Sequence, residues 1–200
     1  ALSLVVTVFI PGLMAGLMGV GGGIVIVPVL YHLFTFLGVE ESVRMQVAVG
    51  TSLATIIPTS IISSYSHYKR GSLDASVLKK LVPGVIVGVI IGAIGSGYLK
   101  GEILTAVFGV IAMLVAINMA FKKEEFSIGD GLPGPAGSGL LGLFIGGTST
   151  LMGIGGGTLG VPLLSALRVP MITAVGTGAA LGFVISVPGA VPGSYALSTL

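Results

Sequence analysis

The sequence predicts an all-α polytopic membrane protein made of two inverted repeats with glycine-broken helices, about seven spans when complete. Three observations lead to this fold class. The composition is 54% hydrophobic and only 8% charged, with a mean hydropathy of +1.11, whereas soluble domains carry roughly 25% charged residues. Three segments have the length of a membrane span, and two glycine-rich stretches of sequence are nearly identical.

Three uninterrupted apolar segments are the clearest predicted spans. They cover residues 46–67, 76–98 and 102–121, and each is close to the ~20 residues that cross a bilayer as a helix. The loops between them are short and hold much of the charge.

A polar stretch rich in Gly and Pro, residues 122–137, divides the chain. We assign residues 1–121 to a first membrane repeat and residues 138–200 to a second. The second repeat is apparently incomplete, because nothing in it matches residues 76–121. We expect the intact protein to contain about two more spans.

Two further apolar stretches, residues 1–37 and 138–168, are too long for one straight span, and a glycine cluster interrupts each. The arms beside the glycines are about 12–18 residues, or roughly 18–27 Å, which is short of the ~30 Å hydrocarbon core. We therefore expect each stretch to form two short helices hinged on glycine. The second helix should begin near Ile24 in the first stretch and near Thr158 in the other.

The two glycine clusters belong to an internal duplication. GLMGVGGGIVIVPVL (16–30) matches TLMGIGGGTLGVPLL (150–164), and AVGT follows both, at 48–51 and 174–177. The copies are inverted if each broken stretch enters and leaves the membrane on one side, and parallel if each crosses once. The short arms favour inversion, and glycine-interrupted segments at corresponding positions of two repeats point to a transporter binding site.

The glycine clusters are the candidate substrate site. Glycine permits the backbone conformations that a break in a helix needs, and the first N–H groups of the following helix attract anions. Hydroxyl groups can also donate to an oxyanion, and they insert into a membrane at lower cost than Lys or Arg. The predicted substrate-binding residues are therefore Gly19, Gly21, Gly22, Gly23, Thr51, Ser52, Gly153, Gly155, Gly156, Gly157 and Thr177.

These features also have structural interpretations. The duplicated glycines could act only as hinges, and Gly84, Gly88 and Gly92 have the spacing of a helix-packing motif. Five hydroxyls on one helical face either line a pathway or bond to carbonyls of their own helix: Ser52, Thr55, Thr59, Ser63 and Ser66.

Three other residues are candidates for movement or coupling. Pro28 and Pro162 follow the glycine clusters and are predicted hinges, although proline also produces simple kinks. His67 is a candidate for proton coupling, whereas its place near the end of a segment favours an interfacial role.

The residue inventory excludes several functional classes. The chain has no Cys and only two His, so we expect no disulfide, metal site or cofactor. The glycines lack the spacing of a dinucleotide fingerprint and the Lys of a phosphate-binding loop, and no catalytic triad or carboxylate pair can be assembled. We expect neither an enzyme nor a nucleic-acid-binding protein, and the sequence does not predict the oligomeric state.

Lys and Arg residues are unevenly distributed over the predicted loops. Two of them, Arg44 and Lys100, fall on one side of the membrane. The positive-inside rule predicts that the opposite side is cytoplasmic. It carries Lys69, Arg70, Lys79, Lys80, Lys122 and Lys123.

The duplicated glycine and Val-Pro motif, with AVGTSLATI and AVGTGAAL, resembles the sulfite exporter TauE/SafE family of membrane permeases. The loop HYKRGSLD, residues 67–74, is similar to that family's first cytoplasmic loop, and the resemblance covers essentially the whole chain. It implies a bacterial or archaeal inner-membrane transporter with two inverted halves and about seven or eight spans. It also implies substrates such as sulfite, sulfonates or related small organic anions.

We therefore expect a secondary transporter of small sulfur-containing anions such as sulfite or organosulfonates. It would work by alternating access around a midplane site at the glycine-hinged helix ends. Its expected partners are the anion and the lipid bilayer. Two alternatives stay open: an anion channel that uses the glycine segments as a backbone filter, and a non-transporting membrane scaffold.

Overall fold

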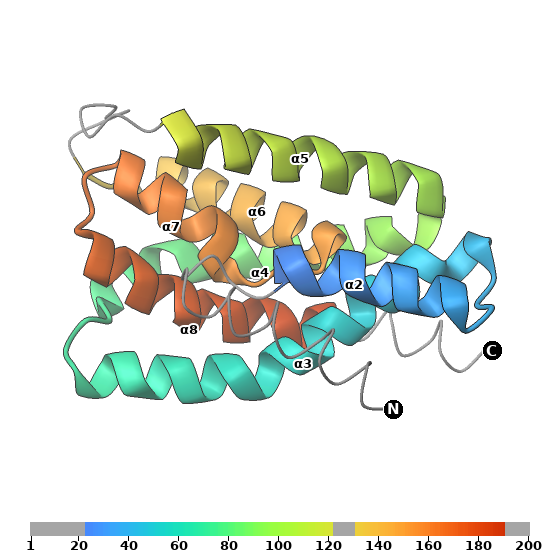
Figure 1. Cartoon of the computed structure of the whole chain (residues 1–200). Coiled ribbons are helices and arrows are strands. Elements are labelled where there is room, and N and C mark those ends of the chain that lie inside the picture. Colours follow the sequence, from blue (N-terminus) through green and yellow to red (C-terminus); the bar gives the residue numbers. More distant parts are fainter. Residues whose placement is uncertain (1–22, 122–130, 191–200) are drawn as a thin grey trace.

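The structure of the protein is a computed structural model that describes residues 23–121 and 131–190. The elements in this part of the chain are all α-helices, which pack side by side as a bundle (Figure 1). The predicted all-α class is therefore confirmed. The helices are α2 (Gly23–Phe36), α3 (Glu41–Lys69), α4 (Ala75–Tyr98), α5 (Gly101–Phe121), α6 (Pro135–Met152), α7 (Gly156–Ala166) and α8 (Met171–Gly189).

Three of these helices, α3, α4 and α8, are long and apolar enough to cross a membrane. The first two confirm the predicted spans at 46–67 and 76–98, and α5 matches the prediction at 102–121. Helix α3 is longer than its apolar segment, because polar residues from Glu41 onward continue the helix at its N-terminal end.

The second broken stretch forms two helices, as predicted. Helix α6 has 18 residues and α7 has 11, so their lengths are about 27 Å and 17 Å at 1.5 Å per residue. Both are shorter than the ~30 Å hydrocarbon core. Helix α6 runs from one end of the bundle to its middle, and α7 returns to the same end (Figure 1). The helix starts at Pro135, a few residues before the predicted boundary at 138.

The described part of the first broken stretch is α2, which begins at Gly23 in the middle of the bundle (Figure 1). It runs to the end opposite to the one that α7 reaches. The equivalent helices of the two copies therefore run in opposite directions from the middle of the bundle. The inverted repeat as a whole stays a prediction, because the first arm of this copy lies outside the described residues.

Helices α4 and α6 pack with their backbones in close contact. A Cβ atom on Gly92 would lie 2.7 Å from the carbonyl oxygen of Gly147, and one on Gly142 would lie 3.0 Å from the Val85 nitrogen. Only glycine leaves room for this approach, which is typical of helix pairs in membranes. The packing interpretation of the predicted glycine motif is confirmed, since Gly84 and Gly88 also face the α6 backbone.

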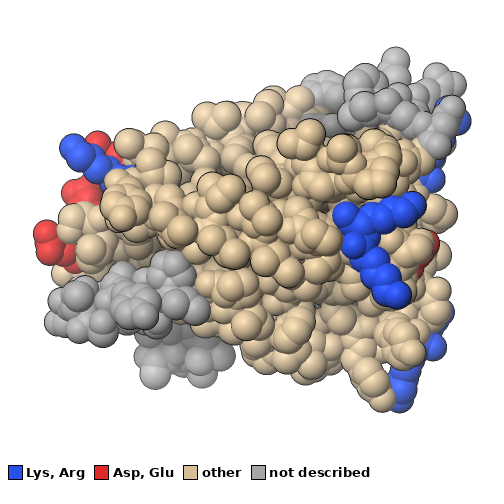
Figure 2. All heavy atoms as spheres, turned by 180° about the vertical axis from the view of Figure 1, so that it is seen from behind, with Lys and Arg blue, Asp and Glu red and all other residues tan. Residues whose placement is uncertain are grey.

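Charged side chains lie at the two ends of the bundle and leave a broad uncharged band between them (Figure 2). The basic end, where α3 ends and α4 and α8 begin, carries Lys69, Arg70, Lys79, Lys80 and Arg168. The mixed end carries Arg44, Lys100, Glu40, Glu41 and Glu102. Between the ends, large apolar side chains of α4 and α5 such as Ile90 and Leu114 are exposed, which is expected of a lipid-facing surface.

Candidate functional site

The site is built around the break between α6 and α7. Gly153 follows the last turn of α6 with φ +68°, a left-handed conformation that favours glycine. The Gly153 N–H donates to the Thr150 carbonyl at 3.3 Å, and the Ile154 N–H donates to the Ser149 carbonyl at 3.0 Å. These two bonds form the Schellman motif that commonly ends a helix. Helix α7 then begins at Gly156, two residues earlier than predicted.

A side chain from the first repeat holds this turn. The Ser52 hydroxyl on α3 donates to the Gly153 carbonyl oxygen at 2.7 Å, and both residues are buried. The backbone of Gly153 also touches α3, because a Cβ on Gly153 would lie 2.8 Å from the Val49 Cα. Val49 of the matched AVGT block and the adjacent Ser52 are therefore in direct contact with the broken helix of the other repeat.

The start of α2 meets the same turn. A Cβ on Gly23 would lie 2.5 Å from the Ile154 Cα and 2.6 Å from the Gly153 carbonyl oxygen. Gly23 is buried and is the first residue of α2, one residue before the predicted start. The structure thus brings Gly23, the last glycine of the first cluster, against the turn of the second cluster in the interior of the bundle.

The first turn of α7 is packed against α8 and α3. A Cβ on Gly156 would lie 2.6 Å from the Leu181 Cβ and 2.8 Å from the Gly182 nitrogen. Gly155 faces Ile56 of α3, and the Cα of Gly157 would lie 3.1 Å from a Cβ on Gly178. These predicted site glycines therefore also have a packing role in the tertiary structure.

Two of the predicted hydroxyl groups differ in environment. The Thr177 side chain is 0% exposed, and its Oγ1 has no hydrogen-bond partner among the described residues. Its repeat counterpart Thr51 is half-buried on α3. Among the described residues, Thr177 therefore has an unused donor next to the α7–α8 contact. A buried hydroxyl without a partner is costly.

Two other hydroxyls of the predicted α3 face, those of Thr55 and Thr59, bond to carbonyls of their own helix. Thr55 Oγ1 donates to the Ser52 carbonyl at 2.7 Å, and Thr59 Oγ1 donates to the Ile56 carbonyl at 3.0 Å. Both side chains are exposed. This arrangement favours the second of the two interpretations, in which these groups bond to helix carbonyls.

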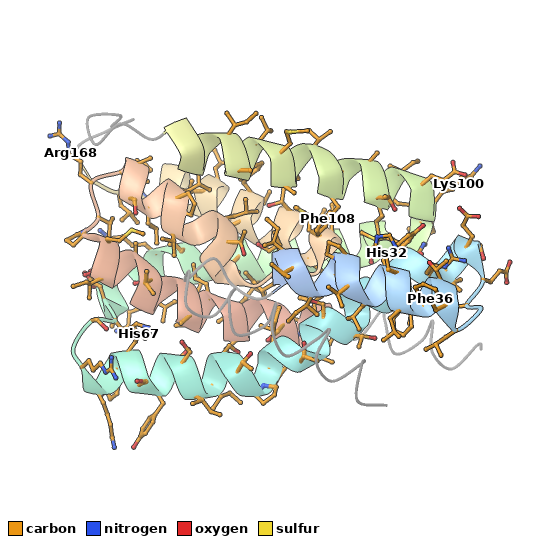
Figure 3. The ribbon with its side chains drawn as sticks, viewed as in Figure 1. His32, Phe36, His67, Lys100, Phe108 and Arg168 are labelled. Atoms are coloured by element: carbon orange, nitrogen blue, oxygen red, sulfur yellow. The ribbon has the colours of Figure 1, made fainter. Side chains whose placement is uncertain are left out.

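His67, Pro28 and Pro162 lie apart from the turn at Gly153. His67 is at the basic end, in the last turn of α3 (Figure 3); its Nδ1 lies 2.8 Å from the Ser72 Oγ, and that hydroxyl donates to the His67 carbonyl at 3.1 Å. The two prolines are inside α2 and α7, which continue through them. Their role as hinges stays a prediction.

Two further predictions concern the first glycine cluster and metal binding. Gly19, Gly21 and Gly22 lie outside the described residues. In the part of the chain that the structure does describe, no group of three or more His, Cys, Asp or Glu side chains could hold a metal ion.

Ser149 is a candidate that the sequence did not indicate. It is 0% exposed on the last turn of α6, and its hydroxyl has no partner among the described residues. The first repeat has Ala15 at the corresponding position, so the duplication gave no signal for a functional hydroxyl there.

Together, the apolar helices, the break between α6 and α7 and the packing of Gly23 on that break are typical of a polytopic helical membrane protein. The comparison with family models agrees: the model described as sulfite exporter TauE/SafE matches residues 4–198. The chain belongs to this family, and the resemblance seen in the sequence is confirmed.

Three curated relatives share much of the chain. A probable membrane transporter protein of Haemophilus influenzae is 35% identical over 89% of this chain and 67% of its own length. One of Methanocaldococcus jannaschii is 31% identical, over 86% of this chain and 64% of its own. The protein YunE of Bacillus subtilis, also called a probable membrane transporter protein, is 31% identical over 94% of this chain and 76% of its own length. The chain thus spans about two thirds to three quarters of these relatives, and no solved structure matches it.

Proposed function

We propose that the protein is a secondary transporter of small sulfur-containing anions, such as sulfite or organosulfonates, in the inner membrane of a bacterium or archaeon. The description of the family model supports the substrate class, and the names of the relatives support a membrane transporter. In the proposal, the two repeats are inverted and rock against each other, so that a central site opens to each side in turn.

The observation that carries the proposal is the contact between Gly23 and the Gly153–Ile154 turn. In the proposal, α2 begins at this contact, so that its first N–H groups, which carry positive dipole character, face the break of the other repeat. The Gly153 carbonyl would repel an anion, but it already accepts the Ser52 hydroxyl. This leaves an environment in the bundle interior that favours negative charge without a charged side chain.

The remaining predicted residues enter the proposal by their positions. The unpaired Thr177 hydroxyl would donate to the anion, while Gly155, Gly156 and Gly157 would position α7 through their contacts with α3 and α8. Gly19, Gly21, Gly22 and Thr51 are assigned to the site through the duplication alone. Proton coupling through His67 would act at the basic end of the bundle, where this side chain lies.

A thermal-shift screen of the purified protein against sulfite, sulfate, thiosulfate, taurine, sulfoacetate and acetate tests the proposal. A ligand that binds only the folded protein at 100 times its dissociation constant adds about 2.7 kcal/mol of stability. We expect a sulfur oxyanion to stabilise the wild type and Thr177→Val to lose most of this effect. Ser186→Ala is the matched control, because that buried hydroxyl of α8 already donates to the Phe183 carbonyl.

Two outcomes would contradict the proposal. If no anion stabilises the wild type, the scaffold alternative is favoured. If reconstituted protein passes the anion without saturation or counterflow, it is a channel rather than a transporter. Substitution of Gly156 is a poor test of binding, since any side chain there would meet Leu181 and Gly182 and disturb folding.

A further inference from the structure

Ser149 occupies a position in the α6 end where an apolar side chain is usual. Its carbonyl accepts the Ile154 N–H at 3.0 Å and forms the longer bond of the Schellman motif. In that motif the residue at the Ser149 position commonly makes an apolar contact with the one at the Ile154 position. Here both side chains are fully buried, but one of them is a hydroxyl.

The neighbouring hydroxyls on α6 show how such groups are normally satisfied at this depth. Thr148 Oγ1 donates to the Phe144 carbonyl, and Thr150 Oγ1 donates to the Gly146 carbonyl at 2.8 Å. The Ser149 hydroxyl has no such partner among the described residues. A buried, unpaired hydroxyl destabilises a fold, and no described residue satisfies this one, so its position between two paired hydroxyls makes it available to a ligand.

Ser149 is also close to the meeting point of the two repeats. Its hydrogen bond to Ile154 places it beside the residue against which Gly23 packs. The Gly153 carbonyl in the same turn is occupied by the Ser52 hydroxyl. Among the described residues, the Ser149 hydroxyl is therefore an unused donor within one helical turn of the break.

We infer that the Ser149 hydroxyl donates a hydrogen bond to the transported oxyanion at the break between α6 and α7. This inference rests on the proposed function and adds a substrate-contacting residue to it. The oxygens of a sulfite or sulfonate group accept hydrogen bonds, and a bond from a hydroxyl to a charged acceptor is stronger than one between neutral groups. The first repeat has Ala15 at the corresponding sequence position, so only the second copy supplies this donor.

The test compares sulfite binding and unfolding for the reconstituted wild type and three variants. Ser149→Ala should raise the dissociation constant for sulfite about tenfold or more, as expected for losing a hydrogen bond to a charged group. Its unfolding temperature without ligand should be unchanged or higher, because no hydrogen bond to a described residue is lost. Ser149→Cys, with a similar shape and a weak donor, should give an intermediate dissociation constant.

Thr150→Ala is the matched control, since it removes an adjacent buried hydroxyl that is paired within α6. It should unfold at a lower temperature and bind sulfite with a wild-type dissociation constant. The inference is overturned if Ser149→Ala binds sulfite as the wild type does, or if it loses as much thermal stability as Thr150→Ala. Binding by the wild type with no effect of Ser149→Ala contradicts this inference alone, whereas a folded wild type that binds neither sulfite nor taurine contradicts the proposed function as well.

Discussion

Ser52 joins two parts of the chain that lie far apart in the sequence. Its hydroxyl bond to the Gly153 carbonyl is buried and spans 101 residues. Replacement of Ser52 by Ala would leave that carbonyl without its side-chain donor, and an unsatisfied buried polar group costs about 1–3 kcal/mol. We expect Ser52→Ala to lower the free energy of unfolding in detergent by an amount in this range.

The matched control for Ser52 is Thr55→Ala, one turn further along α3. The Thr55 hydroxyl is exposed and donates only to a carbonyl of its own helix, so its removal should change stability by no more than about 0.5 kcal/mol. Equal losses for the two variants would show that the bond between the repeats contributes nothing specific.

Asp74 stabilises the start of α4 at the basic end. Its carboxylate accepts hydrogen bonds from the Ser76 hydroxyl at 2.7 Å and the Ser76 N–H at 2.8 Å, and these bonds hold the pKa of Asp74 below its usual value of 3.8. Because the pKa is lower in the folded state, the contribution to stability is present above pH 3.8 and is lost as the pH falls through the folded-state pKa.

We expect this pH dependence to disappear in Asp74→Asn, because Asn caps a helix without titrating. Thermal unfolding of the wild type and of Asp74→Asn should be measured from neutral pH down to about pH 3. The stability of the wild type relative to the variant should fall on acidification. A constant difference over that range would rule out Asp74 as the titrating cap.

At the scale of elements, the contact between α4 and α6 depends on particular glycines and not on glycine content. A Cβ on Gly142 would meet the Leu81 carbonyl and lie 3.0 Å from the Val85 nitrogen, whereas one on Gly139 would meet nothing within 4 Å. Both residues are on α6, one turn apart.

We therefore expect Gly142→Ala to destabilise the protein by about 1–3 kcal/mol through overpacking. Gly139→Ala should be neutral or stabilising by up to about 1 kcal/mol, because Ala favours a helix over Gly. The free energies of unfolding of both variants in detergent should be measured to compare these losses. If both lose the same stability, backbone proximity is not what holds these helices together.

For the whole molecule, the distribution of charge predicts its orientation in the membrane. The basic end carries Lys and Arg together with Asp74, whereas the mixed end adds Glu40, Glu41 and Glu102 to its two cations. The positive-inside rule places the basic end in the cytoplasm. Arg168, which the sequence-based count did not include, lies at this same end and strengthens the bias (Figure 3).

The chain has no cysteine, so single-cysteine variants report this orientation directly. A membrane-impermeant maleimide should label Ser42→Cys, at the mixed end, in intact cells. It should label Ala75→Cys, at the basic end, only after the membrane is permeabilised. Both positions are exposed, so the reverse pattern would invert the assigned topology.

Helices α3, α4 and α5 and the break between α6 and α7 could be predicted from the sequence with small errors in their boundaries, whereas the range of α8 was not predicted. Spans are determined by runs of apolar residues, and a membrane leaves few alternatives to a helix for such a run. The cluster from Gly153 to Gly157 favours a break, because glycine is a weak helix former and adopts positive φ easily, and the start of α7 was predicted within two residues. The packing role of Gly84, Gly88 and Gly92 also followed from their spacing alone.

The candidate site was less predictable, because its properties depend on contacts between distant segments. The sequence placed Ser52, Thr55 and Thr177 in one class of hydroxyls. The tertiary structure gives them different partners: a carbonyl of the other repeat, a carbonyl of the same helix, and none among the described residues. The sequence did not mark Ser149 as a site residue, because the hydrogen-bond partner of a hydroxyl depends on its rotamer and its neighbours in space. A single sequence does not specify these.

By itself, the sequence determined that this is a multi-pass helical membrane protein of the sulfite exporter TauE/SafE family with a duplicated glycine cluster. Those features follow from local hydrophobicity and from short matched motifs. Only the tertiary structure decided that the start of α2 packs on the turn at Gly153 and that Gly156 packs on α8. The reason is physical: a glycine allows close approach by any backbone, and the partner is selected only when all the helices pack together.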